Sequence, residues 1–122
     1  PNIYFLGEKP HTQLPSYVAG LDVALMPYRM GAGLWTAAIY PLKLHEYLAA
    51  DRPVVSSPIA SVLPFNDVIE LAGGVAEWEK AISNALAGTG VGESGDRVKV
   101  ARANDWNVRA EQLHQWYQGL VE

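Results

Sequence analysis

Two charged side chains, Lys43 and Glu46, stand three residues apart near the start of a segment whose apolar spacing predicts a helix over 41–51. Lys43 falls in the first turn, where a cation opposes the helix dipole unless an anion binds nearby. A phosphate group would account for that placement, and the two carboxylate oxygens of Glu46, one turn on, suit a ribose diol. Spacing alone leaves a second interpretation open, a surface ion pair worth roughly 0.2–0.5 kcal/mol.

A long loop over 28–40 leads into this helix, and it follows an apolar run at 23–26 that predicts a strand covered on both faces. The loop has no helical or strand period and contains Gly31 and Gly33. In open parallel sheets, ligands bind beyond the carboxyl ends of the strands. We therefore place a candidate site at this loop and the helix start. Trp35, within the loop, is either a packing residue or a contact to a substrate or partner domain.

The segment 90–95 matches the pattern G-x-G-x-x-G letter for letter. In dinucleotide-binding proteins that pattern follows a strand and opens a helix. Here a predicted helix over 75–87 precedes it, and glycine is frequent throughout 88–95. We interpret 88–95 as a flexible connector and not as a dinucleotide site.

Reactive side chains show no spacing typical of a metal site or a nucleophile. His11, His45 and His114 are far apart and lack neighbouring pairs of carboxylates, so no metal is expected. We expect His11 at the surface, His45 in a structural role on its helix and His114 partly exposed. No Ser–His–Asp or paired-carboxylate arrangement can be assigned, and the catalytic residue stays unknown.

Composition narrows the function classes. The chain has 122 residues, 49% of them apolar and 18% charged, so it can bury a core and is not a disordered tail. A net charge of −4 disfavours nucleic acid as a partner. The absence of cysteine excludes disulfides, thiolate zinc sites and a Cys nucleophile. No run of about 18 apolar residues is present to span a membrane.

Apolar runs alternate with helical periods along the chain. Strands are predicted at 2–6, 23–26, 53–57 and 67–72, and helices at 13–20, 41–51, 75–87, 96–103 and 105–122. This alternation is typical of an α/β fold, a Rossmann-like parallel sheet with flanking helices. We treat 1–122 as a single α/β domain that ends in the terminal helix 105–122.

Spacing also predicts which side chains the helices bury. Leu44 and Leu48 are four apart and should face the core, whereas Thr12 and Asp105 suit helix N-caps. Four basic residues within 97–109 are interpreted as a solvated face. The apolar stripes expected to pack, in the core or against another domain, are Val75, Trp78, Ile82 and Leu86 on one helix and Trp106, Leu113, Trp116, Tyr117 and Leu120 on the last.

The strongest motif is Pro-Leu-Lys-Leu-His-Glu-Tyr-Leu-Ala at 41–49, followed by Arg-Pro-Val-Val at 52–55. Three further blocks accompany it: Asn-Ile-Tyr-Phe-Leu-Gly at 2–7 with Gln-Leu-Pro-Ser-Tyr at 13–17, Asp-Val-Ala-Leu-Met-Pro-Tyr at 22–28, and Asp-Trp-Asn-Val-Arg-Ala at 105–110. Together they resemble, in the same order, segments of the group 1 glycosyltransferases of GT-B fold, the large retaining family four and its relatives. The resemblance covers most of the chain and implies the second half of the C-terminal, nucleotide-sugar-binding domain.

The resemblance implies a role for each matching position. Glu46 would hold the donor ribose, and the start of its helix would meet the donor diphosphate. The loop after the first strand would lie near the base, and the loop over 28–40 would approach the transferred sugar. The expected donor-binding residues are therefore Glu46, Lys43, Leu42, Pro41, Tyr40, Arg29, Tyr28, Glu8 and Lys9.

This sequence departs from the family pattern in three respects. Ala38 stands where many relatives have an acid that contacts the sugar, so that role is unfilled. Asp51 stands where Gly commonly ends the helix, in a left-handed conformation that Asp adopts at modest cost. Because the chain opens with Pro1 and lacks the family's earlier strand–helix units and acceptor domain, we expect a fragment that is inert alone. Its exposed sheet edge makes self-association an expectation too.

The resemblance thus implies part of a glycosyltransferase that uses a nucleotide-diphosphate sugar as substrate, without cofactor or metal. The acceptor would be a glycan or lipid-linked hydroxyl bound by the missing N-terminal domain. Bacterial surface polysaccharide synthesis is implied, in the cytoplasm or at the inner face of the membrane. Two alternatives stay open, a non-catalytic Rossmann-like interaction module and a GT-B-fold sugar-nucleotide epimerase.

Overall fold

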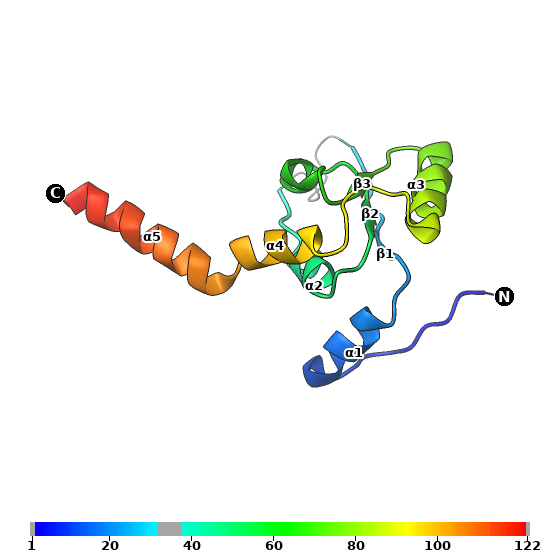
Figure 1. Ribbon diagram of the computed structural model, residues 1–122, viewed down its shortest axis with the longest axis horizontal. Coiled ribbons are helices and arrows are strands. Elements are labelled where there is room, and N and C mark those ends of the chain that lie inside the picture. Colours follow the sequence, from blue (N-terminus) through cyan, green and yellow to red (C-terminus); the bar gives the residue numbers. More distant parts are fainter. Residues whose placement is uncertain (1, 32–37, 122) are drawn as a thin grey trace.

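The computed structural model describes residues 2–31 and 38–121 and shows a small sheet with flanking helices (Figure 1). Trp35 falls outside the described residues, so its role stays a prediction. The strands are β1 (Ala24–Met26), β2 (Val54–Ser56) and β3 (Glu70–Leu71). The helices are α1 (Leu14–Ala19), α2 (Lys43–Ala49), α3 (Val75–Ala87), α4 (Asp96–Ala103) and α5 (Trp106–Val121), with 3-10 helices η1 (His11–Gln13) and η3 (Ala60–Phe65).

The three strands form a parallel sheet in the order β1-β2-β3, with Ala24 beside Val54 in register. β2 is central and buried along its whole length, because helices cover both of its faces. On one face Val54 packs in the cluster that contains Leu48 of α2. On the other face Val55 packs with Ala81 of α3. The predicted α/β class, with a parallel sheet and flanking helices, is confirmed.

Helix α2 buries the side chains that its spacing predicts. Leu44 and Leu48 are both fully buried against the sheet. The helix is shorter at each end than the predicted 41–51. Its C-terminal end turns at Asp51, whose φ of +56° lies in the left-handed region, as expected for the position where a Gly commonly stands.

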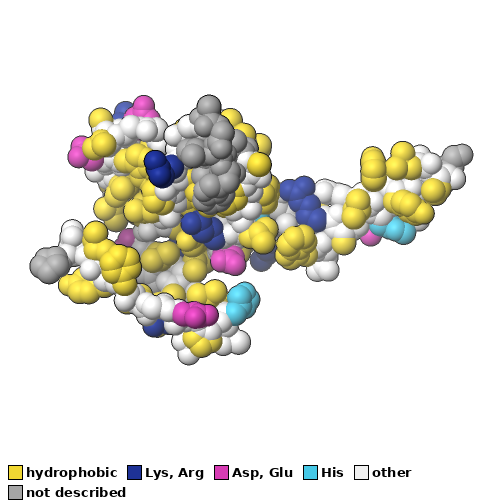
Figure 2. Space-filling model, turned by 180° about the vertical axis from the view of Figure 1, so that it is seen from behind, with side chains coloured by type: hydrophobic (Ala, Val, Ile, Leu, Met, Phe, Trp, Pro, Cys, Tyr) yellow, Lys and Arg dark blue, Asp and Glu magenta, His cyan; other side chains and the backbone are white. Residues whose placement is uncertain are grey.

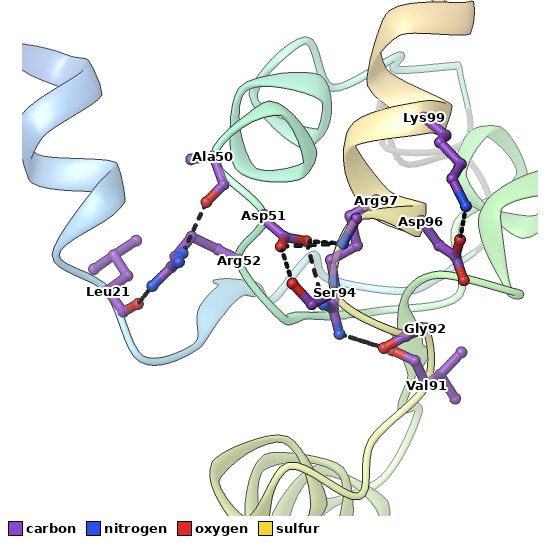
Figure 3. A network of polar contacts seen from close by, with 11 residues as sticks. Leu21, Ala50, Asp51, Arg52, Val91, Gly92, Ser94, Asp96, Arg97 and Lys99 are labelled. Carbon is purple, nitrogen blue, oxygen red and sulfur yellow. Dashed lines mark hydrogen bonds and ion pairs between the residues drawn. The ribbon is translucent and has the colours of Figure 1, made fainter.

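Asp51 also links the end of α2 to the start of α4 (Figure 3). Its carboxylate accepts hydrogen bonds from the Ser94 hydroxyl at 2.6 Å and the Gly95 N–H at 3.1 Å, and lies 3.6 Å from Arg97 Nη1. The Ser94 hydrogen bond is the main reason that the pKa of Asp51 is lowered, and the Gly95 N–H and Arg97 contribute. Arg97 is only 7% exposed and donates to two carbonyls of the connector as well. These contacts anchor α4, which packs against α2.

The connector at 88–95 is tied to the rest of the fold. The Val91 N–H donates to Glu70 Oε1 at 3.1 Å. Gly92 has a φ of +78°, and a Cβ at that position would lie 2.9 Å from the Cα of Val68. The structure has helix α3, not a strand, before this segment, as predicted. The prediction of a flexible connector misses these contacts, which depend on close backbone approach rather than on a sequence pattern.

The strand predicted at 2–6 does not form. Residues 2–10 contain no helix or strand, and their apolar side chains are exposed, Phe5 by 97%. Leu25 of β1 is 44% exposed, so the prediction that this strand is covered on both faces is also wrong. The two errors have separate causes: no described strand pairs with the outer edge of β1, and the face of the sheet at Leu25 is left partly uncovered.

Two further boundaries differ from the prediction. β3 has two residues instead of spanning 67–72, because the N–H groups of Val68 and Ile69 both donate to the Phe65 carbonyl in a turn. The predicted loop before it contains η3. Thr12 is not an N-cap, since it lies inside η1 and α1 begins at Leu14 without a side-chain cap.

Helix α3 has the bounds predicted for it but a different buried face. Ala81 and Ala85 are its buried residues. Trp78 and Ile82 are partly buried, as expected, whereas the outer members of the predicted stripe, Val75 and Leu86, are exposed. The helix therefore faces the core with small alanines, while the large side chains near its two ends stay exposed.

Helix α5 forms an arm that projects from the body (Figures 1 and 2). The Asn107 N–H donates to Asp105 Oδ1 at 2.9 Å, which confirms Asp105 as the N-cap. No residue of α5 is buried, and Trp106 and Trp116 are 75% and 64% exposed. The apolar stripe predicted for this helix is present, but nothing within the described residues packs on it. The prediction that Trp106 and Trp116 pack in the core is therefore wrong.

Candidate functional site

A cleft of about 880 Å³ opens where α2, α4 and the first turn of α5 meet. Figure 2 shows basic side chains at the base of the projecting arm, where the arm joins the body. One wall comes from α2 and the residues just before it, and the other from α4 and the start of α5. The lining residues are Tyr40, Leu42, His45, Glu46 and Ala49 on the first wall, Val98, Ala101, Arg102, Asn104, Asp105, Trp106 and Arg109 on the second, and His11 beside α1.

A second hollow of about 460 Å³ lies between α1 and α2. Its walls are mainly aliphatic, with Leu14 and Val18 on α1 facing Ala49 on α2. Glu46 and His11 line both this hollow and the cleft. Glu46 therefore stands on the border between a hollow with aliphatic walls and a cleft with charged walls.

Glu46 has its carboxylate available for a ligand. The residue is exposed, and among the described residues its side chain makes no hydrogen bond and no ion pair. It is positioned by the core of α2, because burial of Leu44 and Leu48 turns Leu42, Glu46 and Ala49 toward the cleft. Both carboxylate oxygens can accept hydrogen bonds, which is what a vicinal diol requires.

Lys43 is held by an aromatic ring and not by Glu46. Its Nζ lies 5.1 Å from the centroid of the Tyr28 ring, a cation–π distance. The Ser57 hydroxyl donates to the Tyr28 carbonyl at 2.8 Å, which fixes the start of the loop after β1 against β2. Of the two interpretations left open by the spacing, the Lys43–Glu46 surface pair is not formed among the described residues.

Backbone carbonyls just before α2 accept hydrogen bonds from two N–H groups in its first turn. The N–H groups of Leu44 and His45 donate to the carbonyls of Pro41 and Leu42, at 3.1 and 3.0 Å. Over residues 2–31 and 38–121, no side chain caps this end of the helix. These bonds do not involve the N–H groups of Leu42 and Lys43, which also belong to this turn.

His45 packs in the wall of the cleft. Its ring stacks on Tyr40, with the Tyr40 hydroxyl 2.7 Å from Nε2, and meets the edge of Phe65. Nδ1 is buried and finds no hydrogen-bond partner in the part of the chain that the structure describes. Burial, followed by the positive charge of Arg109, lowers the pKa of His45 below its ordinary value. The predicted structural role is confirmed, and the neutral imidazole is the form this wall favours.

The structure gathers part of the predicted set of donor residues. Tyr40, Leu42 and Glu46 line one cleft, and Tyr28 contacts Lys43 next to them. Pro41 is buried at the start of the helix, and Arg29 is exposed in the loop after β1. No hydrogen bond, ion pair or ring contact joins the remaining two, Glu8 and Lys9, to α2 within the described residues.

Lys9 instead folds back on its own segment. Its Nζ donates to the Leu6 carbonyl at 2.5 Å and lies 5.6 Å from the centroid of the Tyr17 ring. His11, two residues on, is the member of this segment that lines the cleft. His11 is exposed, as predicted, and Ala38 is exposed beyond the other end of the cleft wall.

Sequence reasoning missed Arg102, Trp106 and Arg109 as lining residues. Arg102 and Arg109 were assigned to a solvated face, and Trp106 to packing. A cap at Asp105 signals that the chain changes direction there, but only the packing of α4 on α2 brings this turn opposite Glu46.

Within 2–31 and 38–121, no cluster of three His, Cys, Asp or Glu side chains has the arrangement of a metal site. Over the same residues, none of the helices combines the length and the apolar character that crossing a membrane requires.

Comparison with known proteins relates the chain to a glycosyltransferase. It is 31% identical over 127 residues to a protein of Bacillus subtilis (strain 168) named "Putative teichuronic acid biosynthesis glycosyltransferase TuaH". The match covers 93% of this chain and 29% of that protein, so the chain spans less than a third of this relative. The similarity supports a glycosyltransferase. No family model matches the chain, and no solved structure matches it significantly.

Proposed function

We propose that this chain is the donor-binding part of a glycosyltransferase and binds the nucleotide of a nucleotide-diphosphate sugar. The observation that carries the proposal is the 31% identity to a glycosyltransferase over 93% of the chain. The carboxylate of Glu46 on the wall of a cleft supports it, because an exposed acid without a hydrogen-bond or ion-pair partner among the described residues can bind a ribose diol.

The proposed roles follow the chemistry of each side chain. Glu46 accepts hydrogen bonds from the ribose hydroxyls. Lys43, with the N–H groups of Leu42 and Lys43 itself, contacts the diphosphate, whose leaving charge these groups stabilise without a metal. The ring of Tyr28 orients the Lys43 ammonium group toward the loop over 28–40. In this proposal, Tyr40 and Arg29 lie near the transferred sugar.

The rest of the reaction needs surfaces outside this chain. The anomeric carbon of the donor would pass to a hydroxyl of a glycan or lipid-linked acceptor, and the nucleoside diphosphate would leave. We place this activity in bacterial surface polysaccharide synthesis, in the cytoplasm or at the inner face of the membrane. The acceptor domain and self-association through the open edges of β1 and β3 belong to the same proposal.

Calorimetric titration of the chain with UDP, GDP, dTDP and ADP tests the proposal. We expect saturable binding of one nucleotide, weakened at least tenfold by Glu46→Gln, because a hydrogen bond to a charged group is lost. Glu79→Gln on α3 is the matched control, since Glu79 is exposed and makes no hydrogen bond or ion pair in the described structure. If none of the four nucleotides binds, the proposal is wrong and the interaction module becomes the better account.

A further inference from the structure

We propose that Arg109, on the first turn of α5, together with Arg102 at the end of α4, binds the diphosphate of the nucleotide whose ribose Glu46 holds. The inference rests on the proposed function and adds two basic residues to it. It follows from four observations: which residues share the cleft, what the neighbouring hollow offers, how Arg109 is held, and which charges are left without a partner.

The geometry of a nucleotide sets the first constraint. Base and phosphates leave the ribose in opposite directions, so a ribose at Glu46 sends one group to each side of that residue. One side is the hollow lined by Leu14, Val18 and Ala49, where no described side chain other than His11 could meet an anion. The other side is the cleft that contains Arg102 and Arg109. Guanidinium groups bind phosphate oxygens through strong charge-assisted hydrogen bonds, and Leu42 at the start of α2 lines the same cleft, so the diphosphate belongs there.

Arg109 is positioned before any ligand arrives. The Asn104 side chain donates from Nδ2 to the Val100 carbonyl at 2.8 Å, which fixes the amide. Arg109 Nη2 donates to Oδ1 of the same Asn104. The Arg109 N–H also donates to the Asp105 carbonyl at 3.0 Å, which anchors the residue in the first turn of α5. A guanidinium held by a neutral amide keeps its full charge and several N–H groups for a bound anion.

Neither arginine has a carboxylate partner. The chain contains 13 Asp and Glu against nine Lys and Arg, yet no ion pair involves Arg102 or Arg109 among the described residues. Asp105, three residues after Arg102, uses its carboxylate to cap α5, and Glu111, two residues after Arg109, accepts a hydrogen bond from Gln115. The positive charge of Arg109 reaches into the cleft, since it contributes to the lowered pKa of His45. Two unpaired guanidinium groups in one wall suit the bidentate binding of phosphate.

The test compares each of UDP, GDP, dTDP and ADP with its nucleoside by calorimetric titration. We expect Arg109→Gln to weaken the nucleoside diphosphate that binds by about tenfold or more and to leave the nucleoside unchanged. Arg102→Gln should act in the same direction. Arg109→Lys should restore part of the affinity, because it keeps the charge but not the planar fork. The salt dependence of diphosphate binding should become shallower in both Gln variants.

Lys80→Gln is the control for net charge, because Lys80 is exposed on α3 and makes no hydrogen bond or ion pair within the described residues. Far-ultraviolet circular dichroism confirms that each variant is folded. Unchanged diphosphate affinity in Arg109→Gln, with Glu46→Gln still weakening binding, would overturn this inference and leave the proposed function standing. If no nucleotide binds the unaltered chain, the proposed function fails and this inference fails with it.

Discussion

Replacing Asp51 tests whether its carboxylate, and not only its backbone conformation, holds α2 and α4 together. Many sequences place Gly where a helix ends in the left-handed region, so Asp51→Gly removes the side chain and keeps the backbone geometry. Relief of the left-handed penalty and the larger entropy of Gly in the unfolded chain each amount to roughly 1 kcal/mol and oppose one another. The backbone terms therefore nearly cancel.

The lost carboxylate contacts set the size of the effect. A hydrogen bond to a charged group contributes about 1.5–3 kcal/mol, and the low end applies to the exposed Ser94. The Gly95 N–H loses its acceptor as well, and Arg97 loses the carboxylate 3.6 Å from Nη1 while keeping two carbonyl acceptors. We expect Asp51→Gly to lower the free energy of unfolding by about 2–4 kcal/mol, because three contacts are lost together and one of them is to the nearly buried Arg97.

Urea denaturation at pH 7 measures the change, with Asp67→Asn as a control, because Asp67 is an exposed acid whose side chain makes no hydrogen bond or ion pair to any described residue. The folded state lowers the pKa of Asp51, so its stabilisation is complete above the ordinary Asp pKa of about 4 and is lost as the pH falls through the lowered value. The difference between Asp51→Gly and the unaltered chain should therefore shrink toward pH 3. An Asp51→Gly variant as stable as the unaltered chain at pH 7 would refute the reasoning.

Three other predictions follow from local geometry. Gly92→Ala should lower the free energy of unfolding by about 2–4 kcal/mol and Gly88→Ala by about 1 kcal/mol, as measured by urea denaturation of both variants. Both glycines have a positive φ, but only a Cβ at position 92 would clash with backbone, that of Val68. Stability should fall as the pH drops below about 6.5, since the folded state lowers the pKa of His45, and His45→Gln should flatten that fall. Glu46→Gln should change the free energy of unfolding by less than about 0.5 kcal/mol, because the side chain is exposed and forms no hydrogen bond or ion pair with the described residues. A larger change in the same denaturation experiment would show that Glu46 has a structural role.

The spacing of residues in the sequence correctly predicted those helices, strands and caps whose packing or hydrogen-bond partners lie within this chain. Leu44 and Leu48 had the spacing of a buried helix face, and the apolar run at 53–57 became the central strand. Asp105 was recognisable as a cap, because the cap bond depends only on the next two residues. Asp51 was expected in the left-handed region from its place after a helix.

Local pattern failed where burial depends on a neighbour that a pattern cannot supply. The apolar run at 2–6 has the composition of a strand, but a strand also needs a second strand beside it. The stripe on α5 is apolar, yet nothing described packs on it. Hydrophobic spacing shows which face of a segment avoids water, and it does not show whether the covering surface belongs to the same chain.

The candidate site divides in the same way. Glu46 and Lys43 could be proposed from one helix turn. Arg102 and Arg109 could not, because their approach to Glu46 depends on how α4 packs on α2 and on the bend before α5. Contacts between elements distant in sequence decided which basic residues share a wall with the acid.

The central claim is that Glu46 binds the ribose of a nucleotide. The most direct test is a double cycle that combines Glu46→Gln with removal of the sugar hydroxyls from the nucleotide that binds best, the 2′ and 3′ hydroxyls of a ribonucleotide or the 3′ hydroxyl of dTDP. Each change alone should weaken binding about tenfold or more, and the two together should weaken it little further, because they remove the same hydrogen bonds. Full additivity of the two effects, or dideoxy nucleotide binding as tight as the parent, would contradict the account.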